Sequence, residues 1–172
     1  MARIRLMPAA EDDFEGYYRI KCGDGDIFWM GFTGKPDREN LKKCFLCRLG
    51  RIDDAEDGGK RIYIIKPENE EGCLGYMQFT RCGEEIEIAI SVGEDSQGKG
   101  VGKDAVGCAA AILSRLGVKA VARIRDDNVR SQKCFVANGF VRTDDFEPVD
   151  YPASGTVNFR RYESAGQNTQ SK

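Results

Sequence analysis

The strongest constraint in the sequence is the run Gly-Glu-Asp-Ser-Gln-Gly-Lys-Gly-Val-Gly at positions 93–102. It follows an alternating, strand-like stretch at 85–92 and opens a helical pattern that starts at Val101. Glycines at such a junction leave backbone N–H groups unpaired at the positive end of a helix dipole. They also remove the Cβ atoms that would keep a ligand away from the backbone. The run therefore predicts a binding site for phosphate oxygens.

Two common phosphate-binding motifs do not fit this run. A Walker A loop requires Ser or Thr directly after the lysine, to bind Mg²⁺, and this chain has Gly100 there. The dinucleotide fingerprint requires Gly-x-Gly-x-x-Gly, whereas Gly98, Gly100 and Gly102 are spaced Gly-x-Gly-x-Gly. A glycine-rich turn that merely starts a helix is the structural alternative.

Hydrophobic periodicity divides the rest of the chain into short strands and helices. Asp37 is the expected N-cap of the second helix, and Asp126 or Asp127 that of the last helix. Residues 23–32, rich in glycine and aromatic side chains, are expected to form a loop. The predicted strands are 3–7, 61–66, 73–81, 85–92, 119–124, 141–146 and 156–162, and the predicted helices are 11–21, 37–49, 101–116 and 126–137.

Composition excludes several classes of function. The chain has no histidine, so Ser-His-Asp and Cys-His nucleophilic machinery and histidine metal sites are excluded, and we expect no metal. A net charge of -2 and a pI near 5.4 give no basic surface for nucleic acid. No apolar run reaches the ~18 residues of a membrane helix, and the N-terminus lacks a signal-peptide core. We therefore expect a cytoplasmic protein with no membrane partner.

Two motifs together resemble those of the GCN5-related N-acetyltransferases. The first is Gln-x-x-Gly-x-Gly at 97–102. The second, at 128–140, is Asn-x-x-Ser followed by Gly-Phe, and it resembles the branch that acetylates ribosomal proteins and polyamines. The resemblance implies an α/β (α+β) fold with a central mixed, mostly antiparallel sheet of about six to seven strands flanked by about four helices. It also implies a single domain at 1–163, followed by a flexible polar tail at 164–172.

The same resemblance implies acetyl-coenzyme A (acetyl-CoA) as the cosubstrate. Its pyrophosphate would lie on the amides of the glycine loop, and its pantetheine arm would pair with the end of the preceding strand, where a backbone N–H would stabilise the oxyanion. Asn128 would bind the pantetheine or a water beside it, or would only begin a helix. Phe135 stands where many members carry the tyrosine that protonates the thiolate, and Tyr151 and Tyr162 are alternative donors. The implied cofactor-binding residues are Ile90, Ser91, Val92, Gln97, Gly98, Lys99, Gly100, Val101, Gly102, Asn128, Ser131 and Phe135.

Acetyl transfer needs a base, because an amine with a pKa near ~10.4 must lose a proton before it attacks the thioester. Glu87 is the candidate base, since it lies on the polar face of the strand at 85–92. Glu85 is the alternative on the same face. Both carboxylates are equally compatible with a solvated strand face that has no catalytic role.

The resemblance places acceptor recognition between the first two helices, where acidic residues are followed by aromatic ones. Such a set suits an ammonium-bearing acceptor through ion pairing and cation–π contact. It also suits turn aspartates beside aromatics that cover the core. The candidate acceptor-binding residues are Asp24, Asp26, Phe28, Trp29 and Phe32.

These observations predict an acetyl-CoA-dependent N-acetyltransferase. The acetyl group would move to a primary amine, either a small amine or a protein N-terminus, by direct attack on the thioester. The alternative is a catalytically weak acyl-CoA-binding module that acts as a sensor or partner subunit. Two-fold dimers are the commonest protein assemblies, so a homodimer is the oligomer we would look for first.

Overall fold

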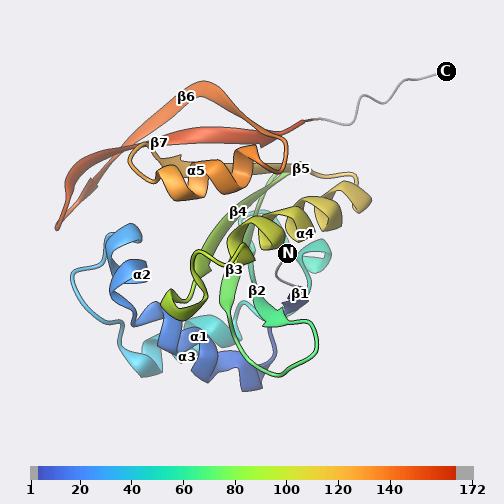
Figure 1. The fold of residues 1–172 in the computed structure, drawn as a ribbon, viewed down its shortest axis with the longest axis vertical. Coiled ribbons are helices and arrows are strands. Elements are labelled where there is room, and N and C mark those ends of the chain that lie inside the picture. The colour runs from blue at the N-terminus through green and yellow to red at the C-terminus, as the bar shows by residue number, and fades with distance from the viewer. Residues whose placement is uncertain (1–3, 166–172) are drawn as a thin grey trace.

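The computed structural model describes residues 4–165, which form one seven-stranded sheet and five α-helices (Figure 1). The predicted tail begins at the last residue of the final strand, and residues 166–172 lie outside the described part. The strands are β1 (Ile4–Pro8), β2 (Lys60–Pro67), β3 (Gly75–Cys82), β4 (Glu85–Val92), β5 (Lys119–Arg125), β6 (Phe140–Tyr151) and β7 (Gly155–Ser164). The α-helices are α1 (Phe14–Lys21), α2 (Asp24–Trp29), α3 (Arg38–Leu46), α4 (Val101–Arg115) and α5 (Val129–Val136), with short 3-10 turns at Glu11–Asp13, Ile52–Asp54 and Glu94–Ser96.

The sheet is mixed and mostly antiparallel, as the sequence predicted. Its strand order is β1-β2-β3-β4-β5-β7-β6, and β4 with β5 is the one parallel pair among residues 4–165. A parallel pair needs a crossover connection, and here α4 supplies it. The pairing of β4 with β5 covers only three residues on each strand.

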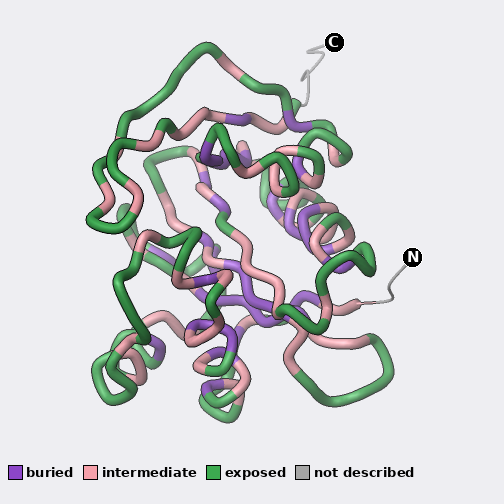
Figure 2. The backbone as a smooth tube through the Cα atoms, turned by 60° about the vertical axis from the view of Figure 1, so that its left-hand side comes forward, coloured by how far each residue is buried: buried purple, intermediate pink, exposed green. Residues whose placement is uncertain are grey.

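Two hydrophobic cores lie on opposite faces of the sheet. One lies between the sheet and α4 and includes Ile86 and Ile88 of β4; the other lies between α1, α3 and the far face of β2 and β3. Strand β2 contributes to both, because its side chains alternate between the faces. Its run Ile62-Tyr63-Ile64-Ile65 is therefore buried without a break. Figure 2 shows burial concentrated in these central strands, whereas most of β6 is exposed.

The structure corrects two local expectations. Residues 23–32 are not a loop throughout, because Asp24–Trp29 form α2, a short helix that begins directly after Gly23. The last helix is capped by Asn128, not by Asp126 or Asp127: the Asn128 side chain accepts a hydrogen bond from the Ser131 N–H at 3.1 Å. The Asp37 cap of α3 is confirmed, since its side chain accepts from the Asn40 N–H at 2.9 Å.

No helix in the described part of the chain is both long and apolar enough to cross a membrane.

Phe45 is the side chain that fixes α3 to the sheet. It is fully buried against Phe14 and Tyr17, whereas its neighbour Leu46 is 38% exposed. We predict that F45A lowers the free energy of unfolding by about 3–5 kcal/mol, because it leaves a cavity among aromatic rings. L46A should change it by less than about 1 kcal/mol. Urea unfolding of the two variants is the measurement, and equal losses would contradict this assignment of the second core.

Candidate functional site

The site is a cleft that opens where β4 and β5 stop pairing. The pairs run from Glu85 with Lys119 to Glu87 with Val121, and beyond them β4 is bonded only to β3. The resulting cavity measures about 790 Å³. It is lined by Arg19, Ile20, Gly23, Gly25, Asp26, Trp29, Met30, Cys73, Ile90, Ser91, Val92, Gly93, Glu94, Asp95, Ser96, Gln97, Gly98, Gly100, Val101, Gly102, Lys103, Asp127, Asn128, Val129, Arg130, Ser131 and Cys134.

The glycine loop forms one end of the cleft and begins α4. Gly98 and Gly100 have φ values of 75° and 85°, which L side chains rarely adopt. Gly100 is the N-cap, so the first N–H groups of the 15-residue helix α4 have no partner within the helix. Gly102 lies against the opposite wall, where an added Cβ would be 3.5 Å from Cys134 Sγ. The loop therefore has the unpaired donors and the close approach that phosphate oxygens require.

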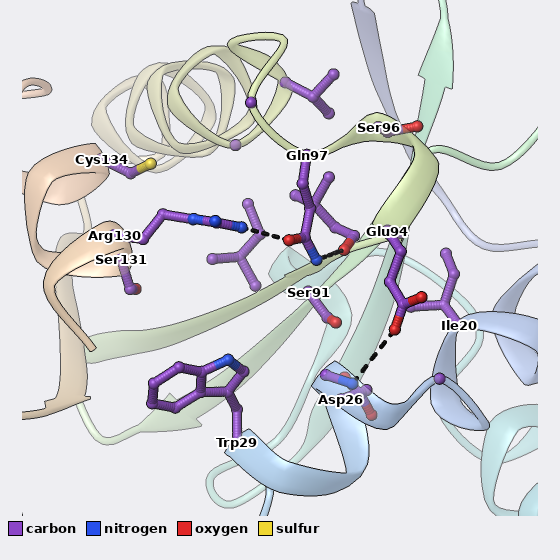
Figure 3. A pocket seen from close by; sticks show the side chains of 18 of the residues that line it. Ile20, Asp26, Trp29, Ser91, Glu94, Ser96, Gln97, Arg130, Ser131 and Cys134 are labelled. Atoms are coloured by element: carbon purple, nitrogen blue, oxygen red, sulfur yellow. Dashed lines mark hydrogen bonds between the residues drawn. The ribbon is translucent and has the colours of Figure 1, made fainter. Parts of the chain in front are cut away.

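A side-chain bridge crosses this end of the cleft (Figure 3). The Gln97 amide donates to the carbonyl oxygen of Val92 at 3.0 Å, and its own oxygen accepts from the guanidinium of Arg130. Arg130 lines the cleft from α5, and sequence reasoning missed it. The signal that was available is its position, two residues after Asn128 at the start of a helix.

Helix α5 contributes residues both to the cleft and to the core. Asn128, Ser131 and Cys134 line the cleft, three residues apart, as one side of a helix requires. Phe135 does not line it: the ring is buried and packs edge-to-face on Phe140, with centroids 5.0 Å apart. Burial also raises the pKa of the Cys134 thiol.

Only two of the five candidate acceptor-binding residues line the cleft. Asp26 and Trp29 line the cleft, whereas Asp24, Phe28 and Phe32 do not. Asp26 is buried and already paired: its carboxylate lies 2.8 Å from Lys21 Nζ and accepts from the Tyr76 hydroxyl at 2.9 Å. Burial, with a smaller contribution from Asp26, raises the pKa of Tyr76 well above its usual value.

The two candidate bases lie on β4 but outside the cleft lining. Glu87 forms an ion pair with Arg123 at 2.8 Å. It precedes Ser91, a lining residue, by four positions, which span ~13 Å in a strand. Glu85 is bonded to Arg161 through both oxygens at 2.8 Å, and this lowers the pKa of Glu85.

Several other predicted residues have clear positions. Ile90, Ser91 and Val92 line the cleft with Gln97, Gly98, Gly100, Val101 and Gly102, while Lys99 is exposed outside the lining. Tyr162 is buried in the main core, and Tyr151 packs against Gly31, where an added Cβ would meet its ring at 2.3 Å. Among the residues that the structure describes, no cluster of acidic side chains and cysteines could hold a metal ion.

The mixed sheet, the gap between β4 and β5 and the glycine loop at the start of α4 together define an acyltransferase domain. A family model described as the acetyltransferase (GNAT) domain matches residues 3–141. The chain belongs to this family, and its members include the GCN5-related N-acetyltransferases that the two sequence motifs resemble.

Solved structures share the fold at low sequence identity. A GNAT-family acetyltransferase from Bacillus anthracis is 12% identical, with a TM-score of 0.78, covering 94% of this chain and 93% of its own. A spermidine N-acetyltransferase from Vibrio cholerae, in complex with CoA and spermine, is 13% identical, with a TM-score of 0.78 and 95% of both chains covered. The aminoglycoside acetyltransferase AAC(6')-Ib, in complex with coenzyme A, is 20% identical, with a TM-score of 0.70, covering 92% of this chain and 93% of its own. No curated protein matches the sequence.

The Asn128 side chain has a structural role that can be separated from any contact with a ligand. Its amide oxygen caps α5, so N128A should lower the free energy of unfolding by about 1 kcal/mol. N128S should keep the protein close to its original stability, because serine is an equally good cap. Thermal unfolding checks this, with about 2–4 °C expected for the alanine variant. Equal melting temperatures for the two variants would contradict the cap.

Proposed function

We propose that the protein transfers the acetyl group of acetyl-CoA to a primary amine. The observation that carries the proposal is the cleft between β4 and β5, which has the glycine loop at one end and α2 at the other. A thioester bound at the strand ends would meet an amine that arrives from the α2 side. Membership of the acetyltransferase family supports the reaction class, and the CoA-bound relatives of the same fold support the cosubstrate.

The chain's own groups would hold the cosubstrate by backbone contacts. The amides from Gln97 to Gly102 would receive the pyrophosphate, and the unpaired edge of β4 at Ile90–Val92 would receive the pantetheine arm. A β4 N–H would stabilise the oxyanion that forms on the thioester carbonyl. Asn128 and Ser131 would complete the wall on the α5 side.

The reaction needs no covalent enzyme intermediate. The amine nitrogen bonds to the carbonyl carbon, the carbon–sulfur bond breaks, and CoA leaves as the thiolate while the amine proton passes to a base. A thiolate with a pKa near ~8.5 can leave without an acid, so the absence of a tyrosine at Phe135 does not prevent turnover. Because Phe135 cannot donate a proton, the alternative function, an acyl-CoA-binding module, is still to be tested.

Turnover and cofactor binding test the proposal together. Release of CoA thiol from acetyl-CoA should be seen with at least one member of a panel of small amines, amino sugars and peptides. G100A should weaken CoA binding at least tenfold, because a Cβ at φ 85° shifts the loop amides. G83A is the matched control: Gly83 also has a positive φ, 62°, but lies in the β3–β4 turn away from the cleft. CoA binding without any thiol release would favour the binding module, and equal affinities of the two variants would contradict the phosphate site.

A pair of variants identifies the base. Glu87 remains our sequence-based proposal, acting through water because its carboxylate pairs with Arg123 outside the lining. Glu94 is the alternative that the structure adds: it lines the cleft, and its carboxylate accepts a hydrogen bond from the Gly25 N–H, at 3.4 Å, but forms no ion pair among the described residues. Loss of the base should lower kcat at least tenfold and remove the acidic limb of the pH profile. We expect that result from either E87Q or E94Q. If neither variant slows the reaction, both assignments are wrong.

A further inference from the structure

The side chain of Arg125, at the end of β5, is a buried cation beside the acceptor end of the cleft. It is 3% exposed, and it donates to both oxygens of Asp127, at 3.0 and 2.8 Å. Its remaining nitrogen, Nη1, is buried with no hydrogen-bond partner among the described residues. A buried guanidinium is costly unless other groups compensate for its lost hydration.

Three aromatic rings supply that compensation. The guanidinium carbon lies 5.0 Å from the ring centroid of Phe28, 5.2 Å from Trp29 and 5.8 Å from Tyr151. These rings come from α2 and from the end of β6, so a single cation joins two segments far apart in the sequence. Distances within about 6 Å are those of cation–π attraction, which is strongest for cations removed from water.

A second buried cation, Lys21, makes similar contacts with residues of this segment. Its ammonium lies 5.0 Å from the Phe32 ring and 2.8 Å from the Asp26 carboxylate, and it donates to the Tyr76 hydroxyl at 3.0 Å. Of the acidic and aromatic residues expected to bind an acceptor ammonium, all but Asp24 therefore already contact a cation of the protein itself. The pairs Arg125–Asp127 and Lys21–Asp26 are each neutral overall, so neither pair offers a net negative charge to an acceptor.

We propose that Arg125 determines acceptor specificity by occupying the place of a second substrate ammonium group, so that the cleft accepts monoamines and disfavours di- and polyamines. This inference rests on the proposed function for the identity of the site. The reacting amine itself needs only one counter-charge, and Glu94 lines the cleft without an ion pair among the described residues. A second ammonium would meet the Arg125 side of the wall, where the charge of Asp127 is already neutralised.

Removal of the guanidinium should create the site that it fills. In R125M the Asp127 carboxylate, which lines the cleft, loses its partner, and the ring of Trp29 loses its cation. A carboxylate beside an aromatic face is a good environment for an alkylammonium group. R125K keeps the positive charge and should keep the exclusion.

The test compares butylamine with 1,4-diaminobutane, which differ by one ammonium group, by calorimetric titration of the CoA-saturated protein at fixed ionic strength. The unmodified protein should bind the diamine no more tightly than the monoamine. R125M should bind the diamine at least tenfold more tightly relative to the monoamine, R125K should show no such gain, and R125M/D127N should lose it. R160M is the matched control, since Arg160 also pairs with an aspartate, Asp126, and lies 4.9 Å from one ring, Phe146, outside the cleft lining.

Two results would overturn the proposal: a tenfold preference of the unmodified protein for the diamine, or no gain in a folded R125M. If R125M does not fold, the preference of the unmodified protein and of R125K still decides. Urea unfolding shows whether each variant is folded, because the Trp29 ring loses its cation in R125M and its fluorescence will change even in a folded variant. Because these readouts measure binding, they stand apart from the assay of CoA release, whose failure would count against the acetyl-transfer proposal alone.

Discussion

The short pairing of β4 with β5 is the constraint on which the rest of the site depends. Backbone N–H and C=O groups in a strand need partners, and after Glu87 those of β4 that point toward β5 face the cleft instead of a neighbouring strand. Each of the two strands then leads into a helix whose N-terminus faces the gap, α4 through Gly100 and α5 through Asn128. A single change in strand pairing therefore produces an unpaired strand edge and two positive helix ends around one cavity.

On the strands beside this cavity, several charged side chains are paired with one another. The ion pairs are Arg123 with Glu87, Arg161 with Glu85, and Arg125 with Asp127. Ion pairs of this kind stabilise little when they are exposed, but a buried charge without a partner would be strongly unfavourable. Acidic residues such as Glu85 and Glu87, which the sequence marks as candidate bases, are therefore also ion-pair partners that link different elements of the fold. What remains for a ligand is mainly the backbone and a few lining side chains, including Gln97, Arg130 and Glu94.

The sequence was sufficient for the parts of the structure that depend on local chemistry. The glycine loop, the alternation in β4 and the Asp37 cap each follow from a few neighbouring residues, and the family resemblance supplied the strand topology. The helix at Asp24–Trp29 was missed because two glycines and two aspartates favour turns, and contacts made far along the chain hold it: Asp26 with Tyr76, and Trp29 with Arg125. The partners of Glu85 and Glu87 could not be read either, because they lie on other strands: Arg123 is on β5, next to β4, and Arg161 is on β7, one strand further, and this order exists only in the folded sheet.

The burial of Phe135 leaves the α5 side of the cleft without an acidic group. Ser131 and Cys134 line the cleft, whereas the ring of the next residue, Phe135, is buried and packs on Phe140. The α5 wall then presents an amide, a hydroxyl and a thiol whose pKa is raised by burial, and none of these is an effective acid at neutral pH. A thiolate leaving group does not require one. Acetyl transfer in this cleft would therefore be limited by how the amine loses its proton and how α2 positions it, and not by how the departing sulfur gains one.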